Sequence, residues 1–321
     1  MKIKQTDINP FKYSNTNKRY YTYDYYLKTT FGAKVAKIPL DCGLTCPNID
    51  GRKGFGGCIY CSDKGSGDFA KEPTVPLDIQ YKQVFEALKQ KWNTDMAIPY
   101  FQAHTNTYAN SKELRKLFFQ ALSFEGCVGI NIATRADCIS DNTIELLSEI
   151  AEKTVLTVEL GLQSIHDSTA KIINRCHTYE EFLSGYERLR KASGKINICI
   201  HIIEGLPGED RDMMLESGKE IARLMPEQVK IHCLNILKNT KLEKMYLSGE
   251  YTPITLSEYI STVCDTLEIL PPQTVIGRLT GDADRNKLQA PLWTLRKTEV
   301  INEIDKELFR RNSYQGKFYF T

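Results

Sequence analysis

Four cysteines gather within twenty residues near the start of the chain, at Cys42, Cys46, Cys58 and Cys61. Thiolate sulfur is the usual ligand of iron–sulfur clusters and a common ligand of structural zinc. Glycine is frequent between the second and third cysteines, and backbone without side chains lets a loop approach a compact inorganic core closely. These glycines are Gly51, Gly54, Gly56 and Gly57. Segment 42–61 is therefore a candidate metal centre.

The spacing of these cysteines allows two interpretations. Together the four form the pattern C-x3-C-x11-C-x2-C, which is typical of a zinc site with four thiolate ligands. Cys46, Cys58 and Cys61 alone would hold a [4Fe–4S] cluster and leave one iron without a protein ligand. An open coordination position of that kind is what catalysis at a metal requires.

Short apolar runs alternate with amphipathic stretches over most of the chain, and this alternation predicts the fold. The runs predict strands at 34–40, 98–104, 128–134, 155–161, 197–203 and 229–235, with helices between them. Such alternation implies parallel β/α units with right-handed crossovers. Six units are too few for a closed eight-stranded barrel. The expected fold class is α/β, an open partial (β/α)6 barrel of the TIM type.

Three parts of the chain differ in composition. Residues 1–33 form a basic, tyrosine-rich segment, and residues 34–250 carry the alternating pattern of the core barrel. Residues 251–321 form a small C-terminal extension, with a strand-like run at 274–279. We expect this extension to cover the mouth of the barrel.

The position of the cysteine loop favours the cluster over zinc. In barrels of this type the chemistry collects at the C-terminal ends of the strands, and the loop directly follows the first expected strand. Zinc ribbons instead pair their cysteine knuckles on hairpins. We therefore take Cys46, Cys58 and Cys61 as the metal ligands. Cys42 is then a packed thiol, with a role as fourth ligand as the alternative.

Several motifs resemble one enzyme superfamily. The C-x2-C pair with the aromatic Tyr60 before its last cysteine is similar to radical SAM proteins, and the long first gap resembles Elongator catalytic-subunit-like enzymes. Residues 174–178 resemble the Asn-Arg-Gly-His-Thr of those enzymes, but Cys176 replaces the glycine, which puts a glycine-specific backbone role in doubt. Segments 230–232, 237–240, 278–282 and 290–293 resemble the bacterial YtqA/YhcC group, which includes tRNA-modifying enzymes of the MnmL type.

The resemblance implies a [4Fe–4S] cluster and S-adenosyl-L-methionine as cofactors, which together generate a 5′-deoxyadenosyl radical, and it places Tyr60 beside them. At the end of the second strand, Gln102, Thr105 and Asn106 would contact the amino and carboxylate groups of the methionine moiety, although a polar turn is the alternative. The end of the fourth strand, with Glu159 and Gln163, resembles the strand that binds the ribose and the carboxylate.

Charged side chains within the expected strands are further candidates. A carboxylate in a buried strand is costly unless it has a partner, so Glu159 is either functional or part of a buried ion pair. Lys230 and His232 lie two residues apart and point the same way, so we expect them to face the substrate as catalytic residues, unless they are structural. Arg135 could hold a carboxylate or phosphate, or pair with Asp137.

The resemblance also implies a substrate, the wobble uridine of tRNA, in the step from its carboxymethylaminomethyl to its aminomethyl form. The charge pattern suits a polyanion, because residues 1–61 carry a net charge of +6 and residues 285–321 one of +4. These basic ends would form one surface if the termini meet, and two solvated faces without a partner are the alternative. Flavodoxin or ferredoxin is the implied electron donor.

Two other functions remain open. The first is a radical SAM oxidase or decarboxylase that acts on a small metabolite. The second, more distant, is an RNA-binding module stabilised by a four-cysteine zinc site. The chain shows neither an apolar run long enough to span a membrane nor a signal peptide at its start. We therefore expect a cytoplasmic protein without a membrane partner.

Overall fold

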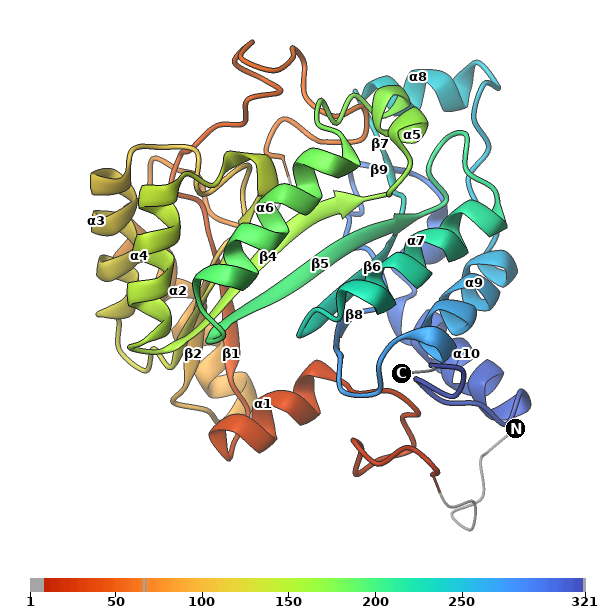
Figure 1. Ribbon diagram of the computed structural model, residues 1–321, viewed down its shortest axis with the longest axis horizontal. Coiled ribbons are helices and arrows are strands. Elements are labelled where there is room, and N and C mark those ends of the chain that lie inside the picture. The colour runs from red at the N-terminus through yellow and green to blue at the C-terminus, as the bar shows by residue number, and fades with distance from the viewer. Residues whose placement is uncertain (1–8, 66, 68, 320–321) are drawn as a thin grey trace.

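A parallel sheet forms the centre of the computed structural model, which describes residues 9–65, 67 and 69–319 (Figure 1). Its seven strands lie in the order β1-β2-β3-β4-β5-β6-β8, and all neighbours run parallel. The strands are β1 Ala36–Leu40, β2 Ala97–Phe101, β3 Gly129–Thr134, β4 Val155–Gln163, β5 Ile196–Glu204, β6 Gln228–Cys233 and β8 Val275–Arg278. All six predicted strands form, which confirms the α/β partial barrel.

The seventh strand, β8, comes from the segment 251–321 that was predicted to be an extension. It lies parallel to β6, with Gln228 opposite Val275 and Val229 opposite Ile276. The barrel therefore has one strand more than the six units predicted. Pairing with β8 covers the edge of β6, and Ile276 N of β8 in turn donates to Tyr21 O at 2.7 Å.

Helices cover the outer face of the sheet (Figure 1). Local sequence explains where several begin: at α6, Thr178 Oγ1 accepts a hydrogen bond from Glu181 N at 3.1 Å while the Glu181 carboxylate accepts one from Thr178 N at 2.8 Å. No described helix is long and apolar enough to cross a membrane. The helices are α1 Tyr23–Phe31, α2 Leu77–Trp92, α3 Ser111–Leu122, α4 Asp141–Ala151, α5 Asp167–Ile172, α6 Tyr179–Ala192, α7 Arg211–Leu224, α8 Lys241–Leu247, α9 Leu256–Ile269 and α10 Lys297–Arg310, and a small antiparallel sheet joins β7 Ile236–Leu237 to β9 Leu288–Ala290.

The two-residue period of the strands separates an apolar face from a polar one. On β4, Leu156, Val158 and Leu160 are fully buried in the core between the sheet and the helices. The alternating residues Glu159 and Gly161 face the concave side, where they line a cavity. The helices thus pack against the apolar face of the sheet, and polar residues line the inside of the barrel.

The carboxylate of Glu159 joins strands β1 to β6 through contacts that we call the Glu159 network. Glu159 is 0% exposed, and burial alone would raise its pKa, but Lys230 and Lys37 hold the pKa well below its ordinary value. One side chain from each of the other five strands contacts it. These are Lys37 Nζ of β1 (2.6 Å), Tyr100 OH of β2 (2.7 Å), Asn131 Nδ2 of β3 (2.9 Å), His201 Nε2 of β5 (2.9 Å) and Lys230 Nζ of β6.

The two basic ends of the chain meet, as the polyanion hypothesis required. Gln315 N donates to Arg19 O at 2.8 Å, and Tyr21 N donates to Gln315 Oε1 at 2.9 Å. Part of the positive charge of these ends is neutralised within the protein, however, because Lys18 pairs with Asp305. The meeting point lies beside the first residues of β8, and Figure 1 shows α1 and the cysteine loop at opposite ends of the sheet. A polyanion bound there would lie far from the C-terminal ends of the strands.

Replacing Glu159 with glutamine tests the Glu159 network. The change keeps the size of the side chain but leaves the buried Lys230 and the half-buried Lys37 without a counter-charge. We expect the free energy of unfolding to fall by about 3–5 kcal/mol, measured by urea unfolding followed with circular dichroism. The matched control is Glu152→Gln, because Glu152 pairs with Lys195 at the surface and such pairs contribute little. Equal losses in the two variants would contradict the role of the network.

Candidate functional site

The three predicted ligand thiols of Cys46, Cys58 and Cys61 line one cavity at the C-terminal ends of the strands, which we call the cysteine cavity. The loop that carries them folds back on itself, since Ile49 N donates to Cys46 O at 2.8 Å and Cys61 N donates to Cys58 O at 3.1 Å. Its sharp turns use positive φ angles that favour glycine. The glycines in this conformation are Gly51, Gly56 and Gly57.

Residues 173–177, which follow α5, hold this loop from behind. Asn48 Nδ2 donates to Asn174 O at 2.7 Å and to Arg175 O at 2.9 Å. In return, Asn174 Nδ2 donates to Gly57 O at 2.7 Å. The motif that resembles the Elongator-like enzymes thus positions the cysteine loop through hydrogen bonds to its backbone and to one asparagine.

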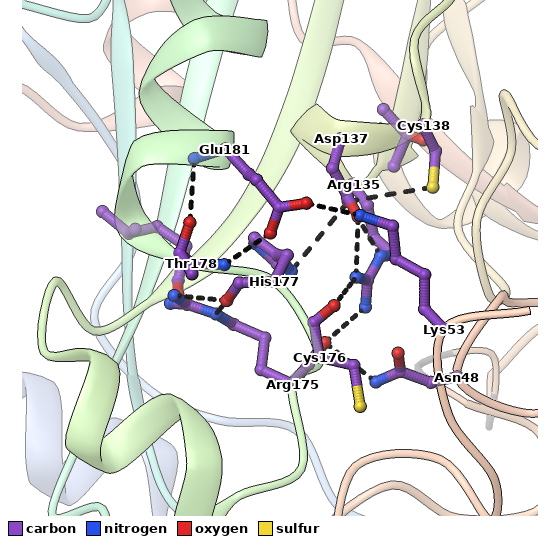
Figure 2. Close-up of polar contacts among 12 residues, drawn as sticks. Asn48, Lys53, Arg135, Asp137, Cys138, Arg175, Cys176, His177, Thr178 and Glu181 are labelled. Atoms are coloured by element: carbon purple, nitrogen blue, oxygen red, sulfur yellow. Dashed lines mark hydrogen bonds and ion pairs between the residues drawn. The ribbon is translucent and has the colours of Figure 1, made fainter.

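Arg135 lies at the centre of an ion-pair network behind the loop (Figure 2). Its Nε and Nη2 donate to the two carboxylate oxygens of Asp137, both at 3.0 Å, and its Nη1 donates to Arg175 O at 2.7 Å. Lys53, from the cysteine loop, lies 2.8 Å from Asp137 and 2.7 Å from Glu181. Of the two hypotheses for Arg135, pairing with Asp137 is confirmed. The guanidinium thus joins Asp137 to the segment of Arg175, and Asp137 joins both to the cysteine loop through Lys53.

Cys176 stands where the related motif has glycine, and its backbone keeps a glycine-like conformation. Its φ is +57°, in the left-handed region that costs a residue with a side chain roughly 1–2 kcal/mol. Its thiol lies 3.3 Å from Asn174 Oδ1. A Cβ atom on Gly54 would lie only 2.6 Å from the Cys176 sulfur. The sulfur therefore fills the space that the small Gly54 leaves, and the turn is retained despite the substitution.

The thiols differ in how readily they ionise. A hydrogen bond with Cys61 and the nearby charge of Arg135 lower the pKa of Cys58 to about 7, although burial opposes this. The thiolate is the form that binds metals. Burial raises the pKa of Cys42 to about 12, and its thiol donates to Asn106 Oδ1 at 3.3 Å. Cys42 thus has the surroundings of a packed, protonated thiol.

Most of the residues predicted to bind cofactors lie on the wall of the cysteine cavity. Asn106 lies behind this wall instead, at 0% exposure. Its Nδ2 donates to the carbonyl oxygens of Phe101, Ala103 and Ala133, at 3.1, 2.9 and 2.9 Å. Asn106 thus holds the turn after β2. The predicted residues on the wall are Tyr60, Gln102, Thr105, Glu159 and Gln163.

Lys230 and His232 line a second cavity, which we call the inner cavity, and Gln102 and Gln163 belong to the walls of both. Lys230 contacts Glu159, so it is part of the Glu159 network. His232 Nε2 is buried and, within the described residues, has no hydrogen-bond partner. Burial and then the neighbouring His201 lower the pKa of His232 well below its usual value. The ring is therefore neutral at neutral pH.

Both oxygens of Glu159 accept hydrogen bonds from protein side chains. Glu159 is therefore part of a buried ion pair, which was one of the two interpretations of this residue. Four members of its network were not predicted. Each is a polar residue in an otherwise apolar strand, at the two-residue period that points inward. This pattern in the sequence could have predicted all four residues. The prediction used it only for Glu159 and for the sixth strand. The four residues are Lys37, Tyr100, Asn131 and His201.

The donor set fits an iron–sulfur cluster, whose usual protein ligands are cysteine thiolates. Within the described ranges, no three His, Cys, Asp or Glu side chains converge closely enough to share one metal ion. The thiols of Cys46, Cys58 and Cys61 instead border a cavity, and a cluster distributes its thiolate ligands over several iron atoms. Asn48 Nδ2 lies 3.6 Å from Cys58 Sγ, a contact of the kind that tunes cluster sulfurs.

Comparison with known proteins agrees with this site. Residues 49–221 match the radical SAM superfamily, and residues 226–310 match the Radical_SAM C-terminal domain. The chain is 46% identical to YtqA of Bacillus subtilis (strain 168), over 97% of this chain and 96% of YtqA. It is 32% identical to YhcC of Escherichia coli (strain K12), over 88% of this chain and 90% of YhcC.

More distant similarities extend the comparison. The chain is 29% identical to the tRNA uridine(34) acetyltransferase of Methanocaldococcus infernus, over 49% of this chain and 29% of that enzyme. The structure of Elp3 from the same organism has a TM-score of 0.60 at 20% identity, over 88% of this chain and 64% of that chain, which shows a shared fold. From the superfamily match, the nearly full-length relatives and the parallel half-barrel, we conclude that this chain is an enzyme of the radical SAM superfamily and belongs to its YtqA/YhcC-type family.

Proposed function

We propose that this enzyme binds a [4Fe–4S] cluster through Cys46, Cys58 and Cys61, with S-adenosyl-L-methionine beside it, and modifies the wobble uridine of tRNA. The observation that carries the proposal is a single cavity whose wall combines these three thiols with polar residues from the strand ends. The inner cavity shares part of that wall. A substrate therefore has a place next to the cofactors.

When bound, the cluster and S-adenosyl-L-methionine supply a radical that takes a hydrogen atom from the substrate, and the protein supplies binding and orientation. In the proposal, Gln102 and Thr105 hold the amino and carboxylate groups of S-adenosyl-L-methionine, and Gln163 and Tyr60 flank it. Glu159 acts indirectly, because it fixes the strands that carry these residues. Asn106, which holds the turn after β2, likewise acts through its neighbours.

Lys230 and His232 are the proposed substrate-facing pair of the inner cavity. The neutral ring of His232 offers one hydrogen-bond donor and one acceptor to a bound molecule. Lys230 supplies a positive charge that Glu159 balances. The segment after β8 contributes Gly281 and Asp282 to the same wall. We propose that this C-terminal extension excludes water from the reaction.

Relatives support tRNA as the substrate. The enzyme from M. infernus acts, by its name, on uridine 34 of tRNA, and it shares 159 aligned residues with this chain. An enzyme that modifies a base binds it outside the stack, in a pocket with polar groups for its edges.

The proposed reaction converts the carboxymethylaminomethyl form of the wobble uridine to the aminomethyl form. Loss of a hydrogen atom, an electron and a proton across the side-chain N–CH2 bond would give an imine, and water would cleave its C–N bond to leave the aminomethyl group and release glyoxylate. The electron would pass to the oxidised cluster. A one-electron donor of the flavodoxin or ferredoxin type would reduce the cluster.

Serine substitutions separate the cluster from a zinc site. Cys46→Ser, Cys58→Ser and Cys61→Ser should each lose the cluster, because each removes one of three thiolate ligands. Cys42→Ser is the matched control and should keep about four irons per chain. Iron content and the visible absorption spectrum after anaerobic reconstitution measure the outcome. A colourless wild-type protein with one zinc, lost in all four variants, would exclude the cluster.

Asp137→Asn tests the ion-pair network behind the loop. The change removes the charge that Arg135 and Lys53 share, so the loop should hold its metal less firmly. We expect iron to be lost to a chelator about 10–100 times faster, as for other residues that orient metal ligands. Asp141→Asn is the control, because Asp141 pairs with Arg188 at the surface. Equal rates of iron loss in the two variants would show that the network does not support the loop.

Nucleoside analysis tests the substrate. In tRNA from a strain that lacks this protein, we expect the carboxymethylaminomethyl form of the wobble uridine to accumulate and the aminomethyl form to disappear, as measured by mass spectrometry. The wild-type protein should restore the pattern, and Cys58→Ser should not. Unchanged nucleosides would contradict the tRNA substrate and favour a small metabolite.

A further inference from the structure

The sheet leaves an open seam between its edge strands β1 and β8, which are not neighbours in the strand order. A third cavity, the seam cavity, follows this gap, with Lys37 and Pro39 on one side and Gly277 and Arg278 on the other. The seam cavity and the inner cavity share six residues, which are Phe69, Tyr100, Gln102, Lys230, Arg278 and Asp282. Arg278 therefore lies at the junction of the two cavities.

Positive charge exceeds negative charge at this junction. Four cationic side chains lie near two carboxylates, which gives an excess of two positive charges. Burial lowers the pKa of Lys37 to about 7. When Lys37 is neutral, the excess is one positive charge. His201 adds no charge, since burial lowers its pKa to about 4. The cations are Lys37, Lys230, Arg278 and Lys297, and the carboxylates are Glu159 and Asp282. A cleft lined by an excess of one sign of charge attracts the opposite charge, so the junction suits an anion.

Arg278 is placed to receive that anion. Its side chain is 32% exposed, and its Nη2 lies 2.6 Å from Asp282 Oδ2. Asp282 also pairs with Lys297, so one carboxylate serves two cations and leaves part of the guanidinium charge unbalanced. Farther out along the seam, Asp24 pairs with Lys28. The planar fork of arginine matches a carboxylate in two parallel hydrogen bonds.

Two buried polar atoms of the inner cavity indicate where the rest of a ligand would lie. His232 Nε2 and Asn235 Oδ1 have no hydrogen-bond partner within the described part of the chain, and both residues line this cavity. Buried polar atoms are rarely left without a partner. Gly281 keeps the space beside them open, because a Cβ atom there would lie 2.6 Å from Asn235 Nδ2.

We propose that the junction is a carboxylate subsite, in which Arg278 binds the acid group of the substrate side chain while His232 and Asn235 hold the polar edge of its ring. Lys230, behind Arg278, adds positive charge. The inference rests on the proposed function and deepens it, because a carboxymethylaminomethyl group ends in a carboxylate. With the acid at Arg278 and the ring at His232, the intervening carbon atoms lie near Gln102, which borders the cysteine cavity.

Binding of two nucleosides to the anaerobically reconstituted enzyme tests this subsite. Equilibrium dialysis would compare 5-carboxymethylaminomethyluridine with 5-aminomethyluridine, which lacks the carboxylate. We expect the wild-type enzyme to prefer the first by at least about tenfold, as one bidentate charge-assisted contact allows. Arg278→Gln should abolish the preference and leave the affinity for 5-aminomethyluridine unchanged. The control Arg296→Gln, which alters a surface pair with Glu299, should keep the preference.

The outcomes separate the subsite from the function. A preference that persists in Arg278→Gln would overturn the subsite and leave the tRNA function standing. Equal affinities in the wild-type enzyme would also overturn it, and the nucleoside analysis of the deletion strain, which does not depend on Arg278, decides the function separately. If Arg278→Gln does not fold, Arg278→Lys replaces it. That variant keeps the charge and loses the fork, so an unchanged preference would overturn the subsite.

Discussion

A carboxylate at the centre of a barrel is stable only when charged and polar donors surround it, and this requirement for Glu159 organises the structure. Its partners come one from each of the strands β1, β2, β3, β5 and β6. The alternating residues of the same strands must then face outward, where the helices bury them. Strands β1 and β8 remain the two edges of this sheet, so the structure is a half-barrel with an open seam between them.

Two separate sets of contacts, made by different residues, position the site. The Glu159 network fixes the strand ends that carry Gln102 and Gln163. The ion pairs of Arg135 and Asp137 fix the cysteine loop from the other side. Neither set includes a thiolate ligand. The cavity between them therefore has walls that are set before any cofactor binds, which is what precise positioning of a reactive species requires.

Much of this could be predicted from local patterns. Apolar runs located six strands because buried parallel strands are continuously hydrophobic, and the crowding of Cys46, Cys58 and Cys61 located the loop whose thiols line one cavity. The short strand β8 was assigned to an extension, since four residues carry too little periodicity to show which edge they join. Asn106 was expected to face the cofactor, but a short amide at a strand end can equally bond nearby backbone carbonyls. Only the fold shows which it does.

The hydrogen bond from Asn48 to Asn174 has a consequence for folding during translation. The two residues are 126 positions apart in the chain, which at ~5–20 residues per second corresponds to roughly 6–25 s of translation. During that interval the ligand thiols are already synthesised, while the segment that shapes their loop is not. The nascent loop is then an unstructured stretch of reactive sulfur. In the proposed function, loading of the cluster would follow completion of the fourth β/α unit, and the reducing state of the surroundings would matter most before that point.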